Sequence, residues 1–248
     1  MSSRSRYTSP VHAGARYVAQ RLILKPAIWR MTTVTVLGQE NLEGVSGPYV
    51  VVSNHTSHLD APLIITALPR RLSRYLAAGA AADYFFDVWW RKGLTALFFN
   101  AFPVDRTGLR GKRGMATSLL DDGVPLLLFP EGTRSRTGEM GNFKPGAAAL
   151  CISRDVPCLP VALVGASEAM PRGAGWPVKG RPPVYVVFGA PMRPADGEKA
   201  AVFSDRIAKE VRGLVDYGMN YREQQQRLAD GPRSLPTERT DDFGGEQR

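Results

Sequence analysis

Short apolar runs that alternate with helix-like segments constrain the fold of this chain more than any other feature. The runs with strand character lie at Thr33–Leu37, Tyr49–Val52, Tyr75–Ala78, Phe98–Val104, Pro125–Phe129, Cys158–Val164 and Val184–Phe188. Helical patterns lie between or after them, at 61–68, 109–120, 147–153 and 199–217. Strands that alternate with helices predict an α/β fold, a single layered domain with a mostly parallel or mixed sheet flanked by helices.

The two ends of the chain differ from this central part. Apolar positions recur at helical spacing from Val11 to Met31 with basic residues between them, which predicts a basic amphipathic helix within an N-terminal segment of residues 1–31. We expect a kink at Pro26. Such a helix either packs against the domain or lies in a membrane interface. Residues 229–248 are predicted to be a disordered tail, which leaves 32–228 as the domain that carries the chemistry.

The charge of the chain indicates an anionic partner. Net charge is +9 and the sequence pI is about 9.8, so nucleic acid, an anionic membrane and phosphorylated small molecules all fit. Cys151 and Cys158 are expected to be small core residues in a reducing compartment. The N-terminus shows no secretion signal, and no apolar run is long enough to cross a bilayer. We therefore expect a chain that is soluble or lies on a membrane without crossing it.

An aromatic cluster extends from Tyr84 to Trp90 and is followed by Arg91 and Lys92. So many large side chains in consecutive positions cannot all point inward from one helix. The cluster either fills part of the core or lies at a membrane interface.

The strand at Tyr49–Val52 runs directly into a polar turn that contains His55, five residues before Asp60. Such a turn at the carboxyl end of a strand is where α/β sheets place their chemistry. A histidine held by a carboxylate suits a general base, because the carboxylate fixes the tautomer and stabilises the imidazolium. Three other interpretations stay open: an ordinary buried histidine, Asp60 as a helix N-cap, and a metal site made of His55, His58 and Asp60.

Polar clusters also follow two other predicted strands. Arg106 follows one, and Glu131 to Arg136 follow another, with Lys144 close behind. If these strands share a sheet, the clusters meet His55 at one edge. Arginine suits bidentate phosphate binding, and Gly132 is expected to leave its backbone N–H open to an anion. The combination predicts a site that deprotonates a hydroxyl group on a phosphorylated molecule.

With these residues in view, the sequence resembles the glycerophospholipid acyltransferase family, which includes the lysophosphatidic acid acyltransferases. The resemblance spans about Tyr49 to Val164 and depends on four blocks in the family's order. They are Asn54-His55-Thr56-Ser57-His58-Leu59-Asp60, Pro103-Val104-Asp105-Arg106, Phe129-Pro130-Glu131-Gly132-Thr133-Arg134-Ser135 and Val156-Pro157-Cys158-Leu159-Pro160-Val161.

The resemblance implies a role for each matching residue. His55 would be the general base, oriented by Asp60, and would activate a glycerol hydroxyl that attacks the thioester of acyl-CoA or acyl carrier protein. The acceptor site would consist of Arg106, Glu131, Gly132, Thr133, Arg134 and Lys144, with the arginines on the phosphate. No metal or redox cofactor and no nucleic acid is implied. The expected partners are the acyl donor, a phosphorylated glycerol lipid and an anionic membrane surface, with the enzyme peripheral on the cytoplasmic, inner face of the cell membrane.

The sequence departs from the family at two places, and these leave donor and acceptor preference open. Asn100 stands where many relatives have glycine, and Ala77 to Ala81 lacks a lysine that many relatives carry. Lysophosphatidic acid is the expected acceptor, with glycerol 3-phosphate or another lysophospholipid or glycolipid as alternatives. A histidine-based metallohydrolase and a non-enzymatic membrane-binding protein are alternatives from other classes.

Overall fold

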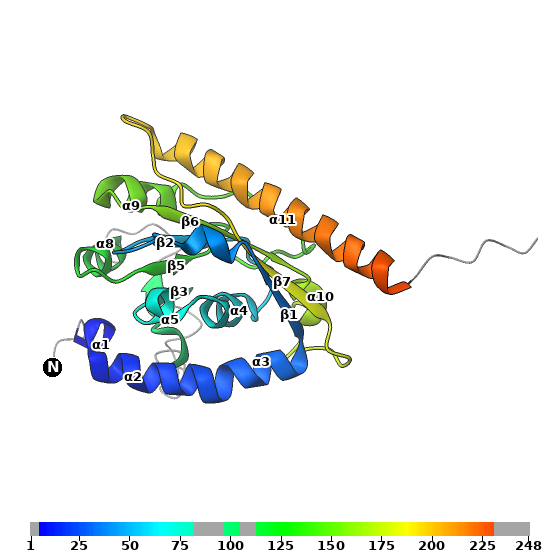
Figure 1. Ribbon diagram of the computed structural model, residues 1–248. Helices are drawn as coiled ribbons and strands as arrows, with labels where there is room; N and C mark the ends of the chain where they lie inside the picture. The colour runs from blue at the N-terminus through cyan, green and yellow to red at the C-terminus, as the bar shows by residue number, and fades with distance from the viewer. Residues whose placement is uncertain (1–4, 82–96, 105–112, 231–248) are drawn as a thin grey trace, which may run out of the picture.

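A seven-stranded sheet forms the centre of the computed structural model, in which the described residues are 5–81, 97–104 and 113–230 (Figure 1). The strands are β1 (Thr33–Leu37), β2 (Val50–Ser53), β3 (Ala77–Ala81), β4 (Phe102–Val104), β5 (Leu126–Leu128), β6 (Cys158–Val164) and β7 (Pro183–Phe188). Their order is β1-β7-β6-β2-β5-β3-β4, and of these strands only β6 and β7 pair antiparallel. The carboxyl ends of β6, β2, β5, β3 and β4 therefore meet at one edge, as a mostly parallel sheet requires.

Helices cover both faces of this sheet, which confirms the predicted fold class. They are α1 (Ser5–Thr8), α2 (Pro10–Ala19), α3 (Lys25–Met31), α4 (Asp60–Ala67), α5 (Arg70–Ser73), α8 (Arg113–Asp121), α9 (Gly146–Arg154), α10 (Ala166–Ala169) and α11 (Ala200–Asp230), with a 3₁₀ turn, η2, at Gln39–Leu42. Figure 1 shows α9 and α11 on one side of the sheet and α2, α3 and α4 on the other. Successive side chains of a strand point to opposite faces, so Val51 packs with Ile64 of α4 and Val50 with Phe203 of α11.

The N-terminal helix is interrupted by a π-helical turn, η1, at Gln20–Leu24. The sequence predicts a kink at Pro26, which lies at the start of α3. In a regular α-helix the proline ring would collide with the carbonyl group of Leu22, and proline has no N–H to donate. In the π turn before it, the N–H of Lys25 bonds to Gln20 O, five residues earlier. The irregularity therefore precedes the proline instead of coinciding with it.

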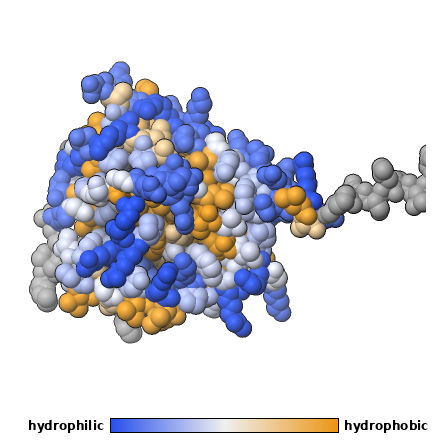
Figure 2. Space-filling model, viewed as in Figure 1, coloured by the Kyte–Doolittle hydropathy of each residue, from blue (hydrophilic) through white to orange (hydrophobic). Residues whose placement is uncertain are grey.

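One side of the N-terminal helix is buried against the domain, and its exposed side carries apolar residues. Arg16 and Ile28 are buried against the domain, whereas Val11, Val18 and Leu22 are 80%, 53% and 70% exposed. Figure 2 shows apolar residues along the lower edge of the molecule, where Figure 1 places α2. Packing on the domain is thus observed, and the exposed apolar side remains for a further contact. No helix within the described parts of the chain combines the length and the apolar character needed to cross a membrane.

Buried polar contacts attach the N-terminal helix to the segment that precedes β4. Arg16 Nη1 donates a hydrogen bond to Asn100 Oδ1 at 3.0 Å, and Gln20 Nε2 donates to Phe98 O at 2.6 Å. Burial, with the nearby charge of Arg6, lowers the pKa of Arg16 to about 10. Asn100 has a φ of 51°, a left-handed conformation that glycine and asparagine adopt most readily. The departure from glycine at this position therefore has a structural reason.

Several predicted bounds differ from the structure. Residues 97–99 are helical and Asn100 has a positive φ, so the strand predicted from Phe98 begins at Phe102. The last helix, predicted to end at Tyr217, continues to Asp230 and includes the first two residues of the predicted tail. Gly218 lies inside this helix and does not end it. A glycine fits there because the helix passes close to the sheet, where a Cβ would lie 3.0 Å from Val164. The aromatic cluster from Tyr84 to Trp90, Arg106 and residues 231–248 lie outside the described residues.

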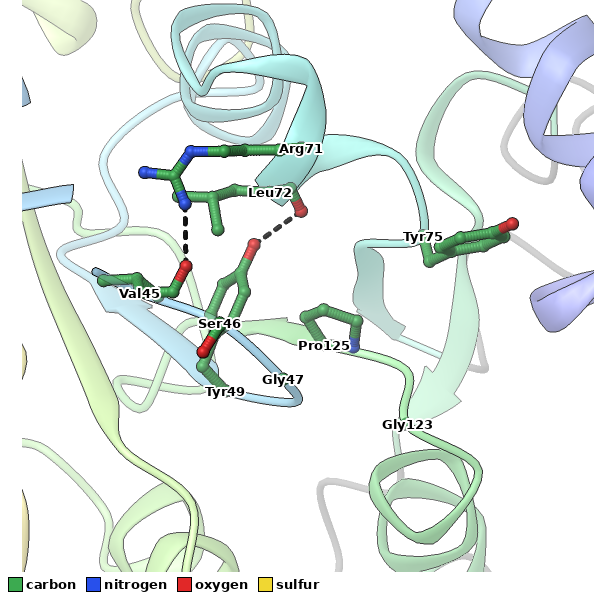
Figure 3. Close-up of a pocket in the computed structure, with 9 residues that line it drawn as sticks. All are labelled: Val45, Ser46, Gly47, Tyr49, Arg71, Leu72, Tyr75, Gly123 and Pro125. Carbon is green, nitrogen blue, oxygen red and sulfur yellow. Dashed lines mark hydrogen bonds between the residues drawn. The ribbon is translucent and has the colours of Figure 1, made fainter. Parts of the chain in front are cut away.

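The opposite edge of the sheet, where β2 and β5 begin, contains a pocket of about 310 Å³ (Figure 3). It is lined by Val45, Ser46, Gly47, Tyr49, Arg71, Leu72, Tyr75, Gly123 and Pro125. The hydroxyl group of Tyr49 donates to Leu72 O at 2.5 Å, and Arg71 donates to Val45 O at 2.7 Å. Burial raises the pKa of Tyr49 far above its ordinary value, so this hydroxyl stays a neutral donor. At this edge Tyr49 and Arg71 therefore donate their hydrogen bonds to backbone carbonyl groups.

Candidate active site

The turn between β2 and α4 brings His55 and Asp60 into contact. His55 Nδ1 lies 2.8 Å from Asp60 Oδ2, and the same oxygen accepts the backbone N–H groups of Thr56 at 2.6 Å and Ser57 at 2.8 Å. On a regular helix a separation of five residues would point the two side chains apart. Residues 54–59 are not helical, and this turn closes the distance as the sequence predicts.

The geometry fixes the tautomer of His55. Asp60 Oδ2 is an acceptor in every contact it makes, so Nδ1 of the imidazole carries the proton and Nε2 keeps a lone pair. Asp60 is fully buried, whereas the side chain of His55 is 22% exposed and therefore accessible. Asp60 Oδ1 is buried without a hydrogen-bond partner among the described residues, so its charge is only partly compensated.

Three residues with no role assigned from the sequence hold this turn in place. The Asn54 side chain donates to Leu163 O and accepts from the N–H of Leu163, both at 2.9 Å, which fixes the turn to β6. The ring of Phe129 stacks on His55 with centroids 4.1 Å apart. The N–H of Ser135 donates to His55 O at 2.8 Å. All three lie inside the quoted sequence blocks, but sequence spacing alone gives no sign of these contacts.

Two alternative interpretations of the motif can now be tested. Leu59 is the N-cap of α4, and Asp60 bonds back to Thr56 and Ser57 instead of to the first turn of the helix, so the N-cap interpretation is wrong. Within residues 5–81, 97–104 and 113–230, no three His, Cys, Asp or Glu side chains are arranged to hold a metal ion. The proposed ligand set of His55, His58 and Asp60 therefore does not assemble.

Glu131 supports the His55–Asp60 turn from the end of β5. Its Oε1 accepts the backbone N–H of His55 at 2.7 Å, and its Oε2 accepts the N–H of Gly141 at 2.9 Å. Burial raises the pKa of Glu131, and the two backbone hydrogen bonds oppose that rise. Both carboxylate oxygens are thus engaged with the backbone of the site. Contact between Glu131 and an acceptor remains a prediction.

The expectation for the backbone of Gly132 is wrong. Its N–H is not open to an anion, because it donates to Phe129 O at 3.0 Å in the turn after β5. Gly132 has a φ of 77°, and a Cβ there would lie 3.1 Å from Lys144 Nζ. The absence of a side chain therefore gives room for the Lys144 ammonium group over the turn. Thr133 and Lys144 are both exposed at this edge.

A positive charge also lies beside the His55–Asp60 turn. The charge of Arg134 reaches His58 and, after the larger effect of burial, lowers the pKa of that histidine. The Arg134 carbonyl accepts a hydrogen bond from Arg172 Nη1 at 3.2 Å. The predicted convergence of His55, Glu131, Arg134 and Lys144 is thus seen at the carboxyl ends of the neighbouring strands β2 and β5. A base with an accessible nitrogen next to cationic side chains can deprotonate a hydroxyl group of an anionic molecule.

Comparisons with known proteins find that this chain is similar to acyltransferases. Residues 33–164 match the family described as Acyltransferase. A chloroplast 1-acyl-sn-glycerol-3-phosphate acyltransferase of Brassica napus is 30% identical over 78% of this chain and 53% of its own length. The 1-acyl-sn-glycerol-3-phosphate acyltransferase of Pseudomonas aeruginosa is 30% identical over 76% of this chain and 72% of its own. The chain spans about half the length of the chloroplast relatives it matches.

A solved structure has the same fold. It is the 1-acyl-sn-glycerophosphate acyltransferase PlsC of Thermotoga maritima, with a TM-score of 0.61 and 26% identity over 82% of each chain. The family match covers more than half of the chain, from β1 through β6, and includes the His55–Asp60 turn. This chain therefore belongs to the acyltransferase family.

Proposed function

We propose that this chain transfers a fatty acyl group from acyl-CoA or acyl carrier protein to the free hydroxyl group of lysophosphatidic acid, giving phosphatidic acid. The observation that carries the proposal is the His55–Asp60 pair, with Nδ1 bonded at 2.8 Å and Nε2 left for a substrate proton. The names of the Brassica, Pseudomonas and Thermotoga relatives support the choice of acceptor.

The reaction then needs one base and no redox step. Nε2 of His55 takes the proton of the acceptor hydroxyl while the hydroxyl oxygen bonds to the thioester carbonyl carbon. The carbon–sulfur bond breaks, the acyl group stays on the acceptor oxygen as an ester, and the leaving thiolate takes the proton from His55. Asp60 holds the ring and stabilises its positive charge throughout.

The acceptor phosphate lies, in this proposal, against the cationic side of the site. Arg106, Arg134 and Lys144 provide the positive charges, and the turn of Glu131, Gly132 and Thr133 shapes the wall. The proximity of Arg134 to His58 and of Lys144 to Gly132 supports this assignment. Arginine is suited to the phosphate because its planar guanidinium group can make two charge-assisted hydrogen bonds at once.

The enzyme acts, in the same proposal, on the inner face of the cell membrane without crossing it. Its acceptor and product are lipids, and the net charge of +9 favours an anionic surface. The exposed side of the N-terminal helix, with Val11, Val18 and Leu22, gives an apolar contact. No metal or redox cofactor takes part.

Release of free thiol from a panel of donors and acceptors tests the proposal. Acyl-CoA and acyl carrier protein are each combined with lysophosphatidic acid, glycerol 3-phosphate, other lysophospholipids or a non-phosphorylated monoacylglycerol. We expect the fastest release with lysophosphatidic acid. A preference for glycerol 3-phosphate would move the assignment to that acceptor, and liposome binding without any turnover would favour a non-enzymatic protein. Arg134→Ala should raise the KM of the phosphorylated acceptor and not that of the monoacylglycerol.

A further inference from the structure

The loop between α10 and β7 presents an exposed tryptophan. This segment, 171–182, is named here the Trp176 loop. Trp176 is 77% exposed and Val178 is 43% exposed, so two apolar side chains lie together in solvent. This segment lies outside the four sequence blocks and takes no part in the proposed mechanism.

The exposure of Trp176 is imposed by a braced backbone. Before it, Ala174 packs against the core and its N–H donates to Pro171 O at 3.0 Å. After it, the N–H of Val178 donates to Ala169 O at 2.8 Å. The chain is therefore held on both sides of Trp176. A tryptophan held outward on a fixed tip differs from one at the end of a loose segment, because little ordering is needed for its ring to make a contact.

The Trp176 loop joins the catalytic turn to the N-terminal helix. Ser57 Oγ donates to the carbonyl group of Met170, the residue just before the loop, at 2.9 Å. At its other end Arg181 Nη2 donates to Trp29 O of α3 at 3.2 Å. Figure 1 shows the loop descending from α10 to the level of α3, on the side of the sheet where α2 and α3 lie. The loop and the exposed apolar side of the N-terminal helix thus belong to one side of the molecule.

The charge of the loop is entirely positive. It contains Arg172, Lys179 and Arg181 and no acidic residue. All three basic residues are exposed. An aromatic ring with cations around it matches the boundary of an anionic bilayer, where tryptophan rings lie at the head-group level and basic side chains meet lipid phosphates.

We propose that the Trp176 loop is a membrane anchor, in which Trp176 inserts at the head-group level of an anionic leaflet and Lys179 and Arg181 bind lipid phosphates. The inference extends the proposed function, because it adds a second contact beside the N-terminal helix, in a segment linked to the His55–Asp60 turn through the hydrogen bond from Ser57 to Met170. Two separate contacts on one side of the molecule restrict its orientation on the leaflet more than one contact does.

Insertion of Trp176 can be measured directly by fluorescence quenching with brominated lipids. The full chain is bound to phosphatidylglycerol vesicles with and without bromine on the acyl chains, and the same is done for Trp176→Phe. We expect a quenched component that disappears in Trp176→Phe, although the other three of the four tryptophans remain. Equal fractional quenching in both proteins would overturn the proposal. The measurement needs no turnover, so it stands or fails separately from the proposed activity.

Charge reversal on matched faces gives the second test. Lys179→Glu is compared with Lys209→Glu, an exposed position on α11 at the opposite face of the sheet. Each cation near an anionic surface contributes about a fivefold change in vesicle partitioning, so Lys179→Glu should weaken binding roughly tenfold or more and Lys209→Glu by less than about twofold. Both variants are checked for an unchanged melting temperature. Equal effects of Lys179→Glu and Lys209→Glu on vesicle binding would overturn the proposal. Unchanged vesicle binding of Lys179→Glu with a raised KM for acyl carrier protein would also overturn it, because the loop would then bind an acidic protein.

Discussion

The two edges of the central sheet both contain polar side chains, yet they use them differently. At the amino-terminal edge, in the pocket of Figure 3, Tyr49 and Arg71 give their hydrogen bonds to backbone carbonyl groups and hold connections in place. At the carboxyl edge, His55 is held from several sides while Nε2 stays available and the side chain remains 22% exposed.

This difference shows that buried polarity alone does not mark a site of chemistry. The amino-terminal edge even has a defined pocket, of about 310 Å³. What separates the carboxyl edge is His55, a partly exposed side chain whose Nε2 makes no hydrogen bond within the part of the chain that the structure describes. Substitutions at the carboxyl edge should therefore change activity more than stability, and substitutions at the amino-terminal edge should do the reverse.

Removal of the base is the strongest test of this contrast. His55→Ala should reduce thiol release by roughly 10³-fold or more, because general-base catalysis contributes up to about 10⁴-fold. Asp60→Asn should cause a loss of similar order, since it disturbs the tautomer of His55. Rates at saturating acceptor, together with melting temperatures, measure both effects. Near-normal turnover in His55→Ala would show that the carboxyl edge does not act through this base.

Glu131 tests whether positioning at the carboxyl edge matters as much as the base itself. Glu131→Gln keeps one acceptor oxygen but replaces the other with an amide NH₂ group, which cannot accept the N–H of His55 or Gly141. A shift of the catalytic turn by about 1 Å can reduce the rate up to about 10²-fold, so we expect a fall in kcat of ten- to hundredfold. A rise in the acceptor KM with kcat unchanged would instead support the direct acceptor contact that the family resemblance implies.

At the amino-terminal edge, Tyr49→Phe should lower stability and leave catalysis alone. The substitution removes the hydroxyl group and leaves the buried Leu72 carbonyl without its donor, a loss of about 1–3 kcal/mol in the free energy of unfolding. Urea denaturation measures the loss. Thiol release, assayed well below the melting temperature, should stay within about twofold of wild type. A large loss of activity in a folded variant would mean that the two edges are coupled.

His58 gives the smallest expected effect, on the pH dependence of stability. Burial, followed by the charges of Arg134 and His55, lowers the pKa of His58 in the folded chain. As pH falls below about 6.5, the unfolded chain takes up this proton first, so the folded state loses stability until the pH is below the folded pKa. Wild type should therefore lose more stability than His58→Gln between about pH 7.5 and about pH 5. Equal losses in the two proteins would show that His58 is not the group responsible.

The sequence could predict the layered fold and the pairing of His55 with Asp60 because both depend on local patterns. A strand with apolar residues on both faces and a polar turn after it can be read from consecutive residues, as at Tyr49 to Asp60. The contacts of Glu131 could not be predicted, since its oxygens bond to His55 and Gly141, which only the folded chain brings near. The interpretation of Gly132 was wrong for a similar reason, because the turn itself uses its N–H.

The sequence by itself determined the α/β class, the family and the pairing of His55 with Asp60, because these follow from the order and spacing of residues along the chain. The tertiary structure decided which side chains are held in place and which are exposed. Asn54 is tied to β6, Asn100 takes a left-handed conformation beside Arg16, and Trp176 is held outward by a braced loop. The contacts of Asn54 and Asn100 join residues far apart in the chain, and packing sets the distance between them. The Trp176 loop is held by nearer residues, Pro171 and Ala169, and by the packing of Ala174 against the core.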